Sequence, residues 1–82
     1  MELQIPDTVV RALRIPEPDM PARLRTELAV TLYAQRVLAF GAARELASMS
    51  VAAFSQLLGT RGVPRHYTAE ELEDDIAYAR RQ

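Results

Sequence analysis

The stretch that decides the fold is FGAARELASMSVAAFSQLL, residues 40–58. It predicts two short helices separated by three residues, with Ser50 as the N-cap of the second helix and Gly59 at its end. Small side chains at Ala43 and Ala47 allow another helix to approach closely. This is the frame of a helix-turn-helix, in which two helices cross steeply and the second can enter the major groove of DNA.

Two positions depart from the usual pattern of that motif. Ser48 stands where the turn usually has glycine, and Arg44 stands where a small residue is common. The pattern therefore also allows an ordinary antiparallel helix pair, and the sequence leaves both interpretations open.

In the helix-turn-helix interpretation, the second helix presents an outward face to DNA. Gln56 can pair with adenine through two hydrogen bonds, and serine can contact most bases. Flanking arginines, Arg36 and Arg65 among them, are candidates for phosphate contacts. This face has no Arg or Asn, so the helix would make few direct contacts to base edges. The alternative is that the face is solvated or contacts another protein. The predicted DNA-binding residues are Arg44, Ser50, Val51, Ser55, Gln56 and Arg61.

A longer helix is predicted upstream, from Ala22 to about Gln35. Leucines recur every four residues, which predicts one apolar stripe, and Pro21 suits the first helical turn. The stripe contains Leu24, Leu28 and Leu32.

The two ends of the chain predict short extended segments. Leu3 and Ile5 alternate with polar residues, which favours a strand; a short helix capped by Asp7 or Thr8 and a proline-rich connector follow. Residues 63–67 predict a second extended segment that pairs with the first or with its copy in a dimer. The expected fold is a mainly α, small helical domain with one or two short β-strands. It divides into residues 1–21, 22–62 and 63–82 of a single domain.

The final helix has the clearest local signal, a T-x-x-E capping box at Thr68 and Glu71. Its first turns hold five acids and its end holds two arginines, an order that the helix dipole mostly explains. No acid has a basic residue three or four places on, so an unpaired acidic patch lies beside an apolar strip. That combination suits a basic partner surface better than a metal. The predicted partner-binding residues are Tyr67, Glu71, Leu72, Asp74, Asp75, Ile76, Tyr78 and Arg80.

Composition argues against an enzyme. The 82 residues contain no cysteine and one histidine, so we expect no disulfide, no metal site, no cofactor and no catalytic relay. His66 is expected to be a structural, hydrogen-bonding residue. The net charge of −1 combines +2 over residues 1–68 (eight Arg, six acids) with −3 over residues 69–82 (two Arg, five acids). A whole-chain charge this close to zero is only weak support for nucleic-acid binding, because nucleic-acid-binding domains are usually basic. The sequence shows neither the basic and apolar pattern of a signal peptide nor an apolar run long enough to span a membrane. We therefore expect a cytoplasmic protein that contacts no membrane.

An ordered set of motifs extends from residue 27 to residue 76. It comprises Glu27-Leu28-Ala29, Leu32-Tyr33, Gly41 to Ala47, Phe54, Leu57-Leu58, Gly62-Val63-Pro64, Tyr67, Glu71-Leu72 and Asp75. The sequence resembles uncharacterised protein family 0175, a group of small prokaryotic proteins. The resemblance implies an antitoxin paired with a PIN-domain ribonuclease toxin, as in VapBC-like modules. It further implies a helix-turn-helix for operator DNA and a tail that docks on the toxin.

The expected function is therefore that of an antitoxin-like transcription regulator, acting as a homodimer in a toxin-antitoxin system. The alternative is a protein-interaction adaptor whose degenerate helix-turn-helix never meets DNA.

Overall fold

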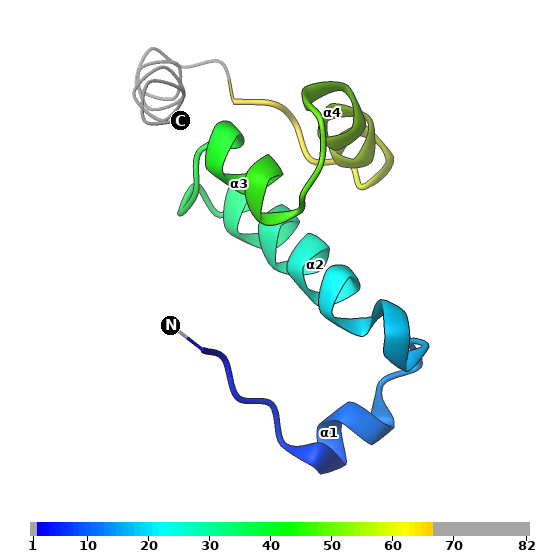
Figure 1. Ribbon diagram of the computed structural model, residues 1–82. Helices are drawn as coiled ribbons and strands as arrows, with labels where there is room; N and C mark the ends of the chain where they lie inside the picture. Colours follow the sequence, from blue (N-terminus) through cyan, green and yellow to red (C-terminus); the bar gives the residue numbers. More distant parts are fainter. Residues whose placement is uncertain (1, 67–82) are drawn as a thin grey trace.

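A computed structural model describes residues 2–66 (Figure 1), so the predicted C-terminal helix and the partner-binding residues from Tyr67 to Arg80 lie outside the described part of the chain. The elements are α1 (Asp7–Ala12), a 3-10 turn (Glu17–Asp19), α2 (Met20–Ala34), α3 (Phe40–Leu46) and α4 (Val51–Thr60). The mainly α class predicted from the sequence is confirmed. None of these helices is long and apolar enough to cross a membrane.

The two predicted β-strands are wrong for the residues that are described. Residues 2–6 form no strand, and neither do residues 63–66. A strand requires a neighbouring backbone for its hydrogen bonds, and these segments lie at opposite ends of the molecule (Figure 1). The His66 amide instead donates a hydrogen bond of 2.7 Å to the Tyr33 hydroxyl.

The helix starts also differ from expectation in detail. The N-cap of α1 is Pro6, with no side-chain hydrogen bond from Asp7 or Thr8, and the Pro6 carbonyl accepts from the amides of Val9 and Val10. Helix α2 begins at Met20, two residues earlier than predicted, with Pro21 in its first turn as expected.

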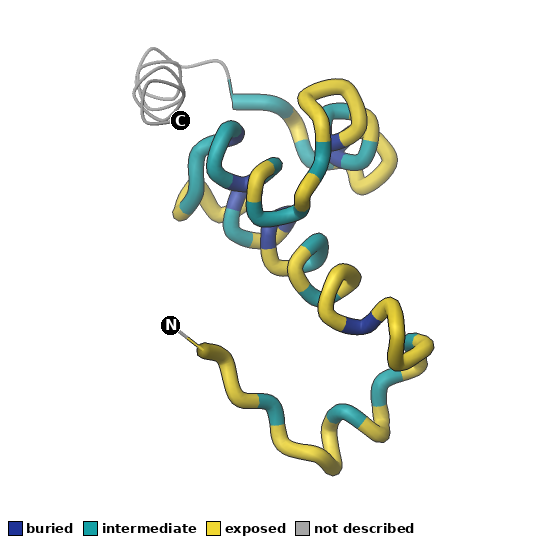
Figure 2. Tube along the Cα trace, viewed as in Figure 1, coloured by how far each residue is buried: buried dark blue, intermediate teal, exposed yellow. Residues whose placement is uncertain are grey.

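The core lies where the C-terminal half of α2 meets α3 and α4 (Figure 2). Tyr33, Phe40 and Phe54 meet edge to face, with ring centroids 5.4–6.3 Å apart in all three pairs. Ala29 and Ala43 are fully buried in the same core cluster, and their small side chains allow α2 and α3 to pack closely, as the sequence predicted for Ala43. Edge-to-face packing fixes ring orientation as well as burying area, so this aromatic cluster sets how the three helices sit.

Helices α2, α3 and α4 end in the same way, with a residue of positive φ that follows the last turn. These residues are Arg36 (φ 61°), Ser48 (φ 56°) and Gly62 (φ 68°). In each case the next amide donates back to a carbonyl five residues earlier, the hydrogen bond that defines a Schellman cap: Val37 to Leu32, Met49 to Arg44 and Val63 to Leu58. The prediction that Gly59 ends α4 is wrong, because Gly62 supplies the left-handed turn and Gly59 lies inside the helix.

Ser48 carries a conformational cost that glycine would avoid. A left-handed φ costs a residue with a Cβ about 1–2 kcal/mol, and glycine avoids this cost. Part of the gain is offset because glycine makes the unfolded chain more flexible, which favours the unfolded state. Ser48→Gly should therefore raise the free energy of unfolding by about 0.5–1 kcal/mol and the Tm by a few degrees. Urea and thermal unfolding followed by circular dichroism measure both.

The matched control is Ser55→Gly, the same change inside α4. It should destabilise by roughly 0.5 kcal/mol, because glycine is a poorer helix former than serine. Equal losses of stability in the two variants would contradict the left-handed turn at Ser48.

Candidate nucleic-acid interface

Helices α3 and α4, joined by residues 47–50, have the connectivity of a helix-turn-helix. In Figure 1, α4 is seen nearly end-on while α2 is seen from the side, so α4 runs across the long helix. Ser50 is the N-cap of α4, as predicted, and its Oγ accepts a hydrogen bond of 3.1 Å from the Ala53 amide. The cap defines where α4 begins, and the left-handed Ser48 turns the chain into it.

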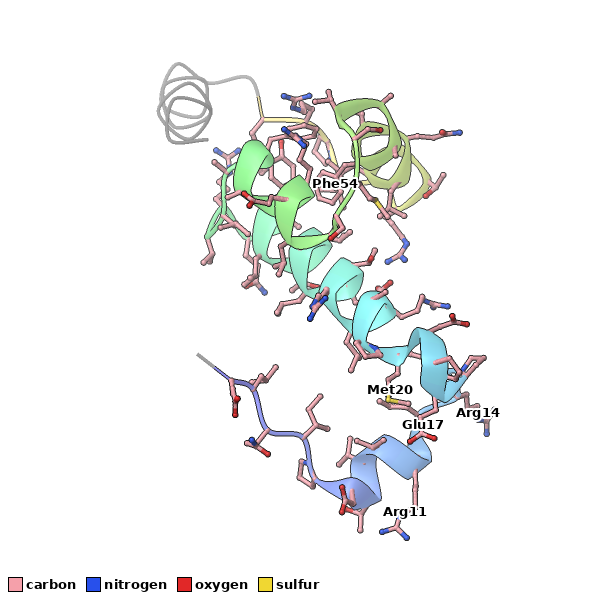
Figure 3. All side chains as sticks on the ribbon, viewed as in Figure 1. Arg11, Arg14, Glu17, Met20 and Phe54 are labelled. Atoms are coloured by element: carbon pink, nitrogen blue, oxygen red, sulfur yellow. The ribbon has the colours of Figure 1, made fainter. Side chains whose placement is uncertain are left out.

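One side of α4 is held by the core. Phe54 points from α4 toward α2 and α3 (Figure 3) and is fully buried, and Leu58, one turn later, is 2% exposed. Leu57 and Met49 pack against the same cluster. These contacts fix the rotation of α4 about its own axis and so decide which residues face outward.

The other side of α4 is open. Gln56 and Ala52 are exposed on this side, and Ser55 is half-buried at its edge. Val51 is 52% exposed, but it lies three residues before Phe54 and so on the same side of the helix as Phe54, uncovered in the first turn. Three residues that the sequence assigned to DNA binding, Val51, Ser55 and Gln56, thus lie on one helix, together with the capping Ser50. Gln56 is therefore accessible to a ligand as large as a DNA duplex.

Arg44 lies in the last turn of α3, and its side chain reaches the segment that joins α3 to α4. Its Nη1 donates to the Met49 carbonyl at 3.3 Å, and the side chain is half-buried. The guanidinium sits at the C-terminal end of α3, where a positive charge complements the helix dipole. This contact supports the turn that leads into α4, a positioning task that the sequence reasoning, which assigned Arg44 to phosphate, did not anticipate.

Arg61 links the end of α4 to α2. Its two terminal nitrogens donate to the two carboxylate oxygens of Glu27 at 2.7 and 2.6 Å. The hydrogen bonds from Arg61 lower the pKa of Glu27 below its ordinary value, and partial burial opposes this. Both side chains are about two-fifths exposed, so water screens the pair. A phosphate approaching Arg61 would compete with Glu27.

Residues 63–66 cross the aromatic cluster after α4 ends. The Arg65 guanidinium lies 3.4 Å from the centroid of the Phe40 ring, and the His66 ring stacks on Tyr33 with centroids 4.6 Å apart. Arg65, a predicted phosphate contact, thus takes part in packing. His66 has a packing role through its ring, and its backbone amide donates to the Tyr33 hydroxyl. The hydrogen bond expected of its side chain is not seen at Nδ1, which is buried without a partner in the described part of the chain.

Sequence reasoning placed Tyr33 in the Leu32-Tyr33 motif but gave it no role in the site. It contacts Phe40, Phe54 and His66, and its side chain is fully buried. The available signal was its chemistry: a tyrosine on the apolar stripe of a helix needs a hydrogen-bond partner for its hydroxyl. The amide of His66 supplies that partner.

Within residues 2–66, no group of three or more His, Asp or Glu side chains gathers closely enough to hold an ion.

Comparison with known proteins gives one family. The model of an uncharacterised protein family, UPF0175, matches residues 1–81. A UPF0175 protein of Aeropyrum pernix is 40% identical over 73 residues, which cover 89% of this chain and 82% of the relative. A UPF0175 protein of Synechocystis sp. is 37% identical over 76 residues, covering 93% of this chain and 81% of the relative. No solved structure gives a significant match.

The ion pair between Glu27 and Arg61 predicts a pH dependence of stability. Because folding lowers the pKa of Glu27, the contribution is complete above the ordinary value of 4.5 and is lost as the pH falls through the lowered pKa. Glu27→Gln should therefore be less stable than the native chain at pH 7, with a difference that shrinks at about pH 3 and in high salt. Urea unfolding at both pH values measures this.

Glu2→Gln, an exposed carboxylate of the N-terminal arm, is the control and should leave the pH profile unchanged. A Glu27→Gln deficit that persists undiminished at about pH 3 would show that the loss is not electrostatic.

Proposed function

The protein belongs to the UPF0175 family, and we propose that it is an antitoxin-like small regulator that binds operator DNA through α3 and α4. Its C-terminal region, residues 67–82, binds a PIN-domain ribonuclease toxin. Both activities reside in one cytoplasmic chain that acts without a cofactor and is not an enzyme.

The observation that carries the DNA-binding proposal is the two-sided character of α4. Its inner side is locked by Phe54 and Leu58, whereas its outer side exposes Ala52 and Gln56. Exposed apolar and amide side chains on a rigid helix suit a groove of DNA, because their positions are set before binding and little ordering is required.

Each outward residue has a chemical task in this proposal. The amides in the first turn of α4 point toward the phosphate backbone, where a helix N-terminus favours negative charge. Gln56 donates to and accepts from adenine, and Val51 contacts the methyl group of thymine. Arg61 exchanges its bond with Glu27 for a phosphate, and Ser50 and Ser55 contact the backbone or base edges.

The toxin-binding proposal rests on the sequence of residues 67–82. Leu72 and Ile76 are four residues apart, a spacing that would put both on one face of a helix, and the acids Glu71, Asp74 and Asp75 are their neighbours in sequence. A ribonuclease groove binds a polyanion and is lined by cations, so an acidic segment with an apolar strip complements it. In this proposal Tyr67 and Tyr78 add aromatic contacts, and Arg80 pairs with the carboxylates of the toxin's metal site.

Two contacts favour the alternative, a protein-interaction adaptor that does not bind DNA. Arg44 and Arg61 both donate within the chain, to the Met49 carbonyl and to Glu27. A DNA-binding face needs its cations available to phosphate. DNA binding would therefore require Arg44 and Arg61 to break these hydrogen bonds, whereas an adaptor would keep them.

DNA binding is tested by fluorescence anisotropy on fragments from the protein's own promoter region. Gln56→Ala should weaken specific binding by about 1–3 kcal/mol, roughly 5- to 150-fold, because one bidentate base contact is lost. The logarithm of the native affinity should fall linearly with the logarithm of the salt concentration.

Gln35→Ala, an exposed glutamine at the end of α2, is the matched control and should bind like the native chain. An affinity that does not respond to salt would exclude phosphate contacts and leave the adaptor function.

Toxin binding is tested by co-purification with a PIN-domain protein encoded beside this gene. The double variant Leu72→Asp with Ile76→Asp should abolish the complex, because it places charge on the apolar strip. Leu3→Asp adds charge at an exposed leucine of the N-terminal arm and should leave the complex intact. Recovery of an unchanged complex from the double variant would refute this mode of docking.

A further inference from the structure

Helix α2 is apolar on two faces, and α3 and α4 bury only one of them. Ala29, Val30 and Tyr33 face the core and are buried. The leucine stripe, defined as Leu24, Leu28 and Leu32, lies roughly 140° further round the helix at 3.6 residues per turn. Leu28, in the middle of the stripe, remains 40% exposed. A helix that is apolar on opposite sides is normally covered on both.

The leucine stripe forms the floor of an open groove that follows α2. Near Met20 the groove has a volume of about 730 Å³, and its other wall is the N-terminal arm, with Leu3, Ile5 and Val10. In Figure 3 the labelled Met20 and Glu17 lie at this end, above α1.

A second hollow continues the groove toward α3. It is lined by Leu32, Leu38 and Ala42, and it shares Arg25, Leu28 and Leu46 with the first. Leu28 is thus the leucine of α2 common to both hollows, which places it at the middle of the groove.

We propose that a second copy of this chain occupies the groove, with the two α2 helices antiparallel about a two-fold axis close to Leu28. A two-fold interface uses the same patch twice, so it must be self-complementary about its centre. The leucine stripe meets this condition, because Leu24 and Leu32 stand four residues to either side of Leu28. Antiparallel contact sets Leu24 of one copy against Leu32 of the other.

The charges at the rim also favour a second copy over a nucleic acid or a strongly charged protein. Glu17 and Arg25 line the first hollow, and Arg25 and Glu45 line the second. A partner of one charge sign would meet like charge at some point along this rim. A copy of the same surface carries both signs and can match them.

The dimer is compatible with the proposed DNA-binding face but does not rest on it. No residue of α4 lines the groove, so a dimer through α2 leaves the outward sides of both α4 helices uncovered. Only eight apolar side chains within residues 2–66 are buried, and a chain with so small a core is often completed by oligomerisation.

The first test is sedimentation velocity of the full chain without DNA or toxin. The native protein, of 9.2 kDa per chain, should sediment as a dimer at micromolar concentration. Leu28→Glu should raise the dimer dissociation constant at least 100-fold, because two carboxylates would meet near the axis. Val37→Glu, at a residue that is 67% exposed and outside the groove, should remain dimeric. A monomeric native chain, as expected if residues 67–82 fill the groove, would overturn the proposal, as would a dimeric Leu28→Glu variant.

A second test stays decisive if Leu28→Glu fails to fold. The chain has no cysteine, so Leu28→Cys introduces a single thiol. Near a two-fold axis, two such thiols lie close enough for a disulfide, so mild oxidation should give a covalent dimer. The control, Val37→Cys, should cross-link far more slowly. Equal rates for the two variants, or no cross-linked Leu28→Cys dimer, would place the contact elsewhere or exclude it.

Discussion

The contact among Tyr33, Phe40 and Phe54 is the constraint on which the rest of the structure depends. Each ring comes from a different helix, and all three pairs meet edge to face. With so few buried side chains in the described part of the chain, these large rings supply much of the apolar area that holds α2, α3 and α4 together. Losing one ring would remove contacts from all three helices.

The same contact governs the surface offered to a ligand. Phe54 and Leu58 fix the rotation of α4, so the exposure of Gln56 and Ala52 on its far side follows from packing in the interior. Arg44 and Arg61 hold the two ends of α4 by bonds to the Met49 carbonyl and to Glu27. The candidate interface is therefore a rigid helix with half-exposed cations beside it, and a ligand that needs those cations must replace bonds that already exist.

The aromatic cluster also extends toward the C-terminal region. Tyr33 accepts a hydrogen bond from the His66 amide and stacks on its ring, and Phe40 lies under Arg65. The chain thus passes directly over the core before it reaches residue 67. In the proposed function, this segment connects the DNA-binding helices to the toxin-binding region, so changes at Tyr33 would affect both.

The sequence by itself determined where the helices lie and how α4 begins, because these depend on local signals. Ser50 caps its own helix, Pro21 enters a first turn, and the spacing of apolar residues marks each helix. Only the tertiary structure decided which face of α2 is buried, since a repeat every four residues shows that Leu24, Leu28 and Leu32 share a side without showing what covers it. It likewise decided that residues 63–66 cross the core and form no strand, because the partner of that backbone, the Tyr33 hydroxyl, lies 33 residues away in sequence.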